Sequence, residues 1–141
     1  MFRVEIGAEK FDVRFRYQDV VLDKDFSVNG TGYQYWRGIE EGEDLPVNAK
    51  VGLRTTCEIS KLHPENEGRE RHETKAVSSV EYHFGKEVKP LTKAEGQKQA
   101  FAKAIAVFTN SRETRRVFWK AFSQAIAAHR WLAGKIERQA V

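Results

Sequence analysis

A cluster of basic side chains lies near the start of the segment NSRETRRVFWKAF, residues 110–122. Arg112, Arg116 and Lys120 are spaced four residues apart and Arg115 follows Arg112 by three, so a helix places all four along one side. A helix amino terminus favours acidic side chains, yet only Glu113 is acidic here. Free N–H groups and guanidinium groups together hold phosphate. The spacing therefore predicts a site for an anionic, phosphate-bearing ligand, and a solvated polar helix face is the alternative.

Aromatic side chains next to a basic one form a second candidate site. Tyr33, Tyr35, Trp36 and Arg37 are the densest such group, and aromatic faces beside cations suit nucleic-acid bases as well as phosphates. Trp36 is the candidate ligand contact. The alternative is a strand that is half core and half sheet surface.

Catalytic and metal-binding patterns have little support. Cys57 lies in the middle of an expected strand, where a buried and inert thiol is the expectation. His63, His72, His83 and His129 are scattered without a metal-ligand spacing. Glycine motifs of the dinucleotide or P-loop kind are missing. We therefore predict a protein that is not an enzyme, with no catalytic residues, no metal site and no cofactor.

Composition favours one folded domain. A chain of 141 residues, 40% apolar and 31% charged, is long enough for one core, so we predict a single domain over residues 1–141. No apolar run has the length of a membrane span, and the start of the chain lacks a signal-peptide pattern. One cysteine permits no internal disulfide. These features predict a cytoplasmic protein without a membrane partner.

Charge is distributed unevenly along the chain. Residues 1–91 carry 14 basic and 17 acidic side chains, a net of −3, whereas residues 92–141 carry 10 basic and 3 acidic ones, a net of +7. A basic face on a neutral-to-acidic body favours phosphate-bearing partners such as nucleotides or nucleic acid.

Period-two alternation predicts that residues 1–90 form the sheet. The expected strands, turns and loops are a hairpin of 2–6 and 11–17 around GAEK, a third strand in FSVNGTGYQYW with Asn29-Gly30 and Gly32 as turn candidates, an acidic loop EEGEDLP, a long strand from Val47 to Ile59, a loop at 63–74, and a last strand from about Lys75 to Phe84.

From Pro90 the period changes and predicts two helices over 92–138, which completes an α+β fold with an antiparallel sheet of four or five strands followed by two C-terminal helices. Thr92 with Glu95 and Asn110 with Glu113 are expected capping boxes. The first helix has one apolar stripe, formed by Phe101, Ala104, Ile105 and Phe108. The second helix is expected to continue to about Glu137.

That second helix is longer than a small sheet needs. Trp131, Leu132 and Ile136 are therefore expected to pack against another copy of the protein, which predicts a homo-oligomer. A fold-back of the helix onto the sheet is the alternative.

Three stretches together resemble a family of small phage-encoded α+β proteins: TTCEI at 55–59, EGQKQAFAKAIAVF at 95–108 and SRETRRVFWKAF at 111–122. The chain departs from that pattern at Gln97, where the family usually has arginine. A sheet followed by two arginine-bearing helices is similar to the phage sponge that sequesters the nucleotide signal of Thoeris defence. The resemblance implies an anti-defence protein in the host cytoplasm, with Arg112 and Arg116 gripping phosphates.

A second stretch, KAEGQKQAFAKAIA at 93–106, is similar to the final helix of double-stranded RNA-binding domains. That resemblance implies that Lys98 and Lys103 contact phosphates.

The leading hypothesis is thus a non-enzymatic, phage-type anti-defence protein that captures a nucleotide signal with a basic two-helix face. The alternatives are a nucleic-acid-binding module that uses the same face, and an inhibitor that binds a host protein complex through the aromatic group and the acidic loop.

Overall fold

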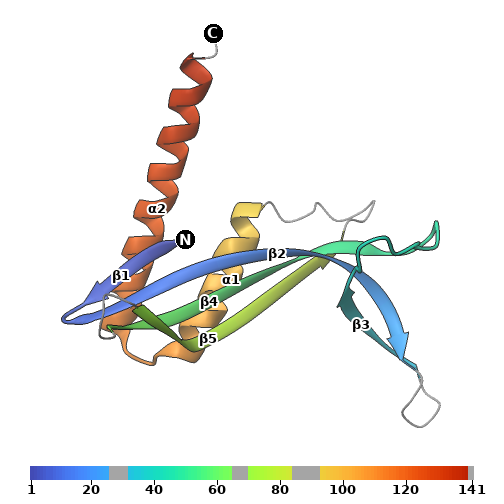
Figure 1. Cartoon of the computed structure of the whole chain (residues 1–141), viewed down its shortest axis with the longest axis horizontal. Coiled ribbons are helices and arrows are strands. Elements are labelled where there is room, and N and C mark those ends of the chain that lie inside the picture. Colours follow the sequence, from blue (N-terminus) through green and yellow to red (C-terminus); the bar gives the residue numbers. More distant parts are fainter. Residues whose placement is uncertain (26–31, 65–69, 84–92, 140–141) are drawn as a thin grey trace. The chain divides into compact units, whose positions relative to one another are not determined.

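The chain is an α+β protein in which an antiparallel sheet of five strands precedes two C-terminal helices, as predicted. A computed structural model describes residues 1–25, 32–64, 70–83 and 93–139, with side chains in the last helix described as far as Ala128. The elements are β1 (Phe2–Ile6), β2 (Glu9–Asp25), β3 (Tyr33–Gly38), β4 (Val51–Pro64), β5 (Glu70–His83), α1 (Lys93–Phe108) and α2 (Arg112–Gln139), labelled in Figure 1.

Strands β1, β2, β4 and β5 are neighbours in that order, and β3 pairs with β2. The chain forms two compact units that share the long strands. Unit 1 comprises Met1–Arg14, Glu58–Val77 and Ala104–Val141, and unit 2 comprises Phe15–Cys57 and Ser78–Lys103. A single domain over residues 1–141 stays a prediction.

The first hairpin confirms the alternation in the sequence. Ile6 pairs with Glu9 and Phe2 with Val13, which leaves Gly7 and Ala8 as a two-residue turn. Gly7 has a φ of 59°, a conformation that glycine adopts without a steric cost. The register places Val4, Phe11 and Val13 in the core of unit 1.

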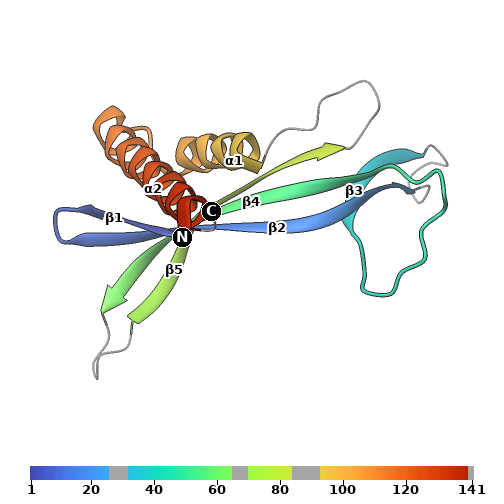
Figure 2. The ribbon, with the colours of Figure 1, turned by 90° about the horizontal axis from the view of Figure 1, so that it is seen from above.

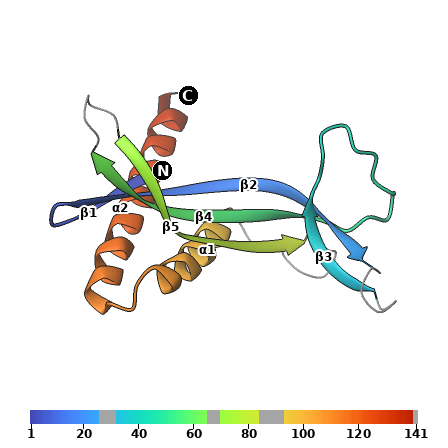
Figure 3. The same ribbon diagram turned by 60° about the horizontal axis from the view of Figure 1, so that its bottom comes forward.

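The core of unit 1 is aromatic where β1 and β2 meet the helices, and the pairing of α2 with β1 is visible in Figure 3. The Phe11 ring lies 5.2 Å from the Phe108 ring and 5.7 Å from the Phe118 ring, centroid to centroid. Phe2 packs edge-on against Phe122 at 6.0 Å. Because Phe118 and Phe122 are buried one helical turn apart, they fix which side of α2 faces the sheet.

The core of unit 2 lies between its strands and the first turns of α1. Val20, Val21, Cys57, Val80 and Phe101 are all buried. The predicted burial of the Cys57 thiol is confirmed, since no part of Cys57 is exposed, and its inertness stays a prediction. In the same unit β3 runs beside the last part of β2 (Figure 2), where Val20 pairs with Gly38 and Asp25 with Tyr33.

Strand limits differ from the prediction in several places. β2 continues to Asp25 instead of ending near residue 17, and β4 begins at Val51 instead of Val47. The loop predicted at 63–74 is wrong at both ends, because β4 runs to Pro64 and β5 begins at Glu70. Polar side chains in this stretch bond across the strands: His63 Nε2 lies 2.6 Å from Glu73 Oε2.

Other parts of the strand prediction fall outside the described residues. The turn candidate Asn29-Gly30 and Phe84 are among them, whereas the third strand is confirmed as β3. The acidic loop is confirmed too, since residues 39–50 form no strand and Gly42 has a φ of 77°.

The two helices match their predicted extents, but the capping residue of the second helix differs from the predicted one. Thr92 of the first capping box lies outside the described residues. At the second helix the cap is Ser111 instead of Asn110, because the Thr114 N–H donates to Ser111 Oγ at 3.3 Å. The apolar stripe of α1 is confirmed: Phe101, Ala104 and Ile105 are buried.

Helix α2 continues to Gln139, and its 28 residues include Trp131, Leu132 and Ile136. The side chains of these three lie outside the described part, so self-association stays a prediction. Within the described residues, neither helix has the length and apolar character needed to cross a membrane.

Candidate phosphate-binding face of helix α2

The start of α2 is fixed by local hydrogen bonds. Thr109 Oγ1 accepts from the Ser111 N–H at 3.0 Å, and the Ser111 carbonyl accepts from the Arg115 N–H at 3.0 Å. Together with the Ser111 cap, these bonds set the direction of the first turn. The bonds of Thr109 and Ser111 therefore help to set which side chains of the first turn of α2 point to solvent.

Three of the predicted basic residues lie on the outer side of α2. Arg112, Arg116 and Lys120 are all exposed, and we call them the basic stripe. Arg116 and Lys120 lie two residues before and after the buried Phe118, which is about 200° around the helix at 3.6 residues per turn. The packing of Phe118 against the sheet thus turns the stripe away from the core.

Within the described residues, the basic stripe lacks the carboxylate partners that several other arginines have. Arg3, Arg37 and Arg54 each form an ion pair, with Asp12 at 3.0 Å, Asp23 at 2.6 Å and Glu81 at 2.9 Å respectively. Among the described residues, no hydrogen bond or ion pair holds the side chain of Arg112, Arg116 or Lys120. The charge of the stripe is therefore not neutralised within the part of the chain that the structure describes.

Arg115 does not join the stripe. Its side chain is half-buried, and Arg115 Nε donates to the Thr109 carbonyl at 2.9 Å. This carbonyl follows the last turn of α1, where helix carbonyls lack partners. The prediction that four basic side chains line one side therefore holds for three of them, and Arg115 instead ties the start of α2 to the end of α1.

The remaining candidate residues belong to unit 2, whereas the basic stripe belongs to unit 1. Lys98 and Lys103 are exposed on α1. Trp36 is half-buried in β3, and its carbonyl accepts from Arg54 Nη2 at 2.9 Å. The structure therefore gathers three of the seven candidate residues on one helix face.

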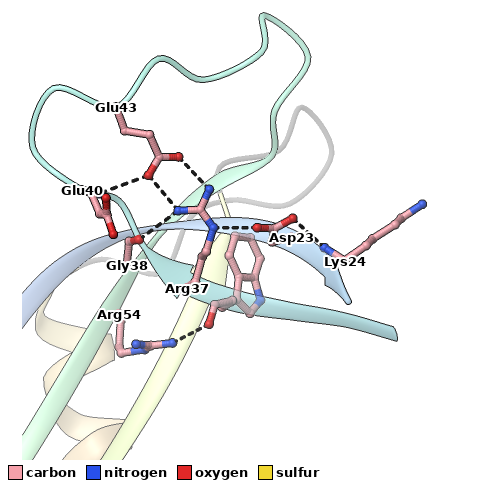
Figure 4. Close-up of polar contacts among 8 residues, drawn as sticks. Asp23, Lys24, Arg37, Gly38, Glu40, Glu43 and Arg54 are labelled. Atoms are coloured by element: carbon pink, nitrogen blue, oxygen red, sulfur yellow. Dashed lines mark hydrogen bonds and ion pairs between the residues drawn. The ribbon is translucent and has the colours of Figure 1, made fainter. Parts of the chain in front are cut away.

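Arg37, which the sequence groups with the aromatic residues, bonds to two acidic side chains (Figure 4). Its Nε donates to Asp23 at 2.6 Å, and its two terminal nitrogens donate to Glu43 at 2.8 and 2.6 Å. Hydrogen bonds from Arg37 and from the Glu40 N–H lower the pKa of Glu43 to about 2. This arginine fastens the acidic loop to β3, and its charge is neutralised.

Sequence reasoning missed a polar groove in unit 2. It has a volume of about 610 Å³ and is lined by Arg16, Tyr17, Gln18, Arg54, Thr56, Ser79 and Glu81. The alternation of polar residues in β2 and β4 indicated a polar sheet face, but only the pairing of strands brings these residues together.

His63 and His72 contact acidic side chains. His72 Nε2 lies 3.2 Å from Asp12 Oδ2 and 3.3 Å from Arg14 Nη2. Asp12 is 1% exposed and also accepts from Arg3 Nε at 3.0 Å. Among the described residues, no group of three or more histidine, cysteine or acidic side chains could hold a metal ion.

Fold and site together define an α+β protein with an exposed basic face on its last helix. Comparisons of the chain with protein-family models, with curated proteins and with solved structures found no match.

Proposed function

We propose that the protein is a non-enzymatic binding protein that captures a phosphate-bearing ligand through the basic stripe. The observation that supports this most is the contrast among arginines: Arg3 and Arg37 are paired with carboxylates, and the stripe is exposed and unpaired within the described residues. Guanidinium groups suit phosphate because they donate two parallel hydrogen bonds.

The ligand in this proposal is a nucleotide signal, and the protein acts by sequestering it. The resemblance of the helices to small phage-encoded proteins supports this choice, and it extends the proposal to an anti-defence role in the host cytoplasm. Lys98 and Lys103, exposed on α1, are further candidate phosphate contacts.

Nucleic acid is the second candidate, and the shape of the stripe favours it. Arg112 and Lys120 are eight residues apart, which spans about 12 Å at 1.5 Å per residue. A row of cations on the open side of a helix suits a chain of phosphates as well as a single one. Affinity that depends steeply on salt would identify such a polyanion.

The test reverses two charges of the stripe. We expect Arg112→Glu with Arg116→Glu to abolish binding at the basic stripe without lowering the melting temperature, since acidic side chains in the first turns suit the helix dipole. Lys10→Glu with Lys50→Glu is the matched control, because it changes the net charge equally at two exposed residues outside the helices. This control should bind as the unaltered protein does.

Binding is measured by fluorescence anisotropy with a labelled cyclic adenine nucleotide, a labelled single-stranded DNA and a labelled RNA duplex. For a stripe that contacts three phosphates, the slope of log K against log salt should be about −2 for the single strand and about −3 for the duplex. Mass spectrometry of ligand retained through purification identifies a bound nucleotide. Unchanged binding by the Arg112→Glu, Arg116→Glu variant would end the proposal.

A further inference from the structure

The polar groove of unit 2 is assembled from three strands. Arg16 and Gln18 come from β2, Arg54 and Thr56 from β4, and Ser79 and Glu81 from β5. Its volume of about 610 Å³ lies within the range of small-molecule sites. Every residue that lines it carries a hydrogen-bonding side chain.

Arg54 is held in this groove by three bonds. Its Nε donates to Glu81 at 2.9 Å, its Nη1 to Gln18 Oε1 at 3.4 Å, and its Nη2 to the Trp36 carbonyl at 2.9 Å, the last drawn in Figure 4. A guanidinium has five N–H groups, so these bonds leave one N–H on each terminal nitrogen. Arg54 is therefore fixed in place with two donors left over.

Hydroxyl groups supply a further donor. Thr56 Oγ1 and Ser79 Oγ lie 2.8 Å apart, and only one of the two hydroxyl protons can lie between them. The other proton can be donated to a ligand. The lining includes two guanidinium groups, of Arg16 and Arg54, and one carboxylate, of Glu81, so the lining side chains carry a net charge of +1.

Fixed donors and a net positive charge are the features that bind an anionic oxygen group. We propose that this groove is a second phosphate site, in which Arg54, Arg16 and the Thr56–Ser79 hydroxyl pair hold a phosphate group of a nucleotide or of a nucleic-acid strand. The inference does not rest on the basic stripe, because every lining residue lies in unit 2.

Arg37 provides an internal comparison within unit 2. Its guanidinium meets two carboxylates, of Asp23 and Glu43, whereas that of Arg54 meets one. An anion near Arg37 would be repelled by both acids. The same conservative substitution at the two arginines therefore separates a phosphate contact from a purely structural ion pair.

The experiment titrates the full chain with inorganic phosphate and follows arginine side-chain N–H resonances by NMR. The side-chain N–H resonances of Arg54 and Arg16 should shift on addition of phosphate, and those of Arg37 should not. Arg54→Lys should raise the Kd for phosphate about tenfold, because lysine cannot keep the three anchoring bonds and also donate a fork. Arg37→Lys should leave the Kd unchanged.

Ser79→Ala is the second variant, since it removes only a half-buried hydroxyl and keeps the strand. It should raise the Kd about threefold, and it decides the matter if Arg54→Lys does not fold. Titrating the Arg112→Glu, Arg116→Glu variant separates the two sites: the groove should still bind phosphate there.

Adenosine monophosphate and an oligothymidylate distinguish the two sources of phosphate. If the nucleotide displaces inorganic phosphate at concentrations at which the oligonucleotide does not, the site takes free nucleotides, and the reverse result indicates a strand. The proposal would be overturned if phosphate changed only the resonances of α2 residues. It would also be overturned if both Arg54→Lys and Ser79→Ala kept the wild-type Kd for phosphate.

Discussion

Replacing Asp12 by asparagine tests whether the buried carboxylate of unit 1 stabilises the fold. Asp12 is 1% exposed and accepts hydrogen bonds from Arg3 at 3.0 Å and from His72 at 3.2 Å. Asparagine keeps the size of the side chain and removes the charge. Each remaining partner is partly exposed, so water compensates the charge that Arg3 retains, which lowers the cost below that of breaking a fully buried pair.

The expected loss is therefore that of one charge-assisted hydrogen bond, about 2 kcal/mol in the free energy of unfolding. For a chain of 141 residues this lowers the melting temperature by roughly 6–10 °C. Asp19→Asn is the matched control, because it removes the same charge from an exposed residue of the same strand. Its expected effect is within about 0.5 kcal/mol.

The difference in the free energy of unfolding between the unaltered protein and Asp12→Asn should also depend on pH. Burial raises the pKa of Asp12, but the hydrogen bonds from Arg3 and His72 lower it by more, so the folded-state pKa lies below the unfolded one. The stabilisation is then fully present above the unfolded pKa of about 3.9 and is lost as the pH falls through the folded-state value. Urea unfolding at pH 7, 5 and 3 measures the difference. Equal stabilities of Asp12→Asn and Asp19→Asn at pH 7 would refute the reasoning.

Three further predictions concern other parts of the fold. The bonds from Arg37 and the Glu40 N–H lower the pKa of Glu43 to about 2, so the acidic loop should stay attached to β3 at pH 4 and detach only as the pH falls to about 2. Hydrogen exchange of residues 40–50 measures this detachment, and release of the loop at pH 4 would contradict the prediction. Ser111→Ala should cost about 1 kcal/mol by removing the cap of α2, with Ser123→Ala, exposed in the middle of that helix, as the control in thermal unfolding. Phe118→Ala should cost about 3–5 kcal/mol, since the ring is fully buried; a cost below 1 kcal/mol in urea unfolding would show that α2 does not depend on this contact.

Local patterns in the sequence predicted the elements that local interactions determine. The first hairpin follows from alternation and from Gly7, and the helices follow from apolar residues spaced at three and four. The loop predicted at 63–74 failed because its polar residues are satisfied by partners in another strand, such as the pair of His63 and Glu73. No spacing within a single segment reveals a cross-strand pair of that kind.

The candidate site shows the same division. Helical periodicity predicted the common side of Arg112, Arg116 and Lys120, which depends on the helix alone. Periodicity also placed Arg115 on that side. The structure differs there because Arg115 bonds to the Thr109 carbonyl, and this bond depends on how the chain turns between the helices. The groove around Arg54 was not predictable, since it needs the pairing of three strands that are distant in the sequence.

The single cysteine offers a built-in reporter of unfolding. Cys57 is completely buried in β4, so a thiol reagent can reach its sulfur only when that strand opens. Labelling rates therefore measure the opening of unit 2 in the unmodified chain and in each variant, with no engineered probe. The same burial means that preparations of the folded protein should not form disulfide-linked dimers on storage in air, and such dimers, where they appear, mark molecules that have unfolded.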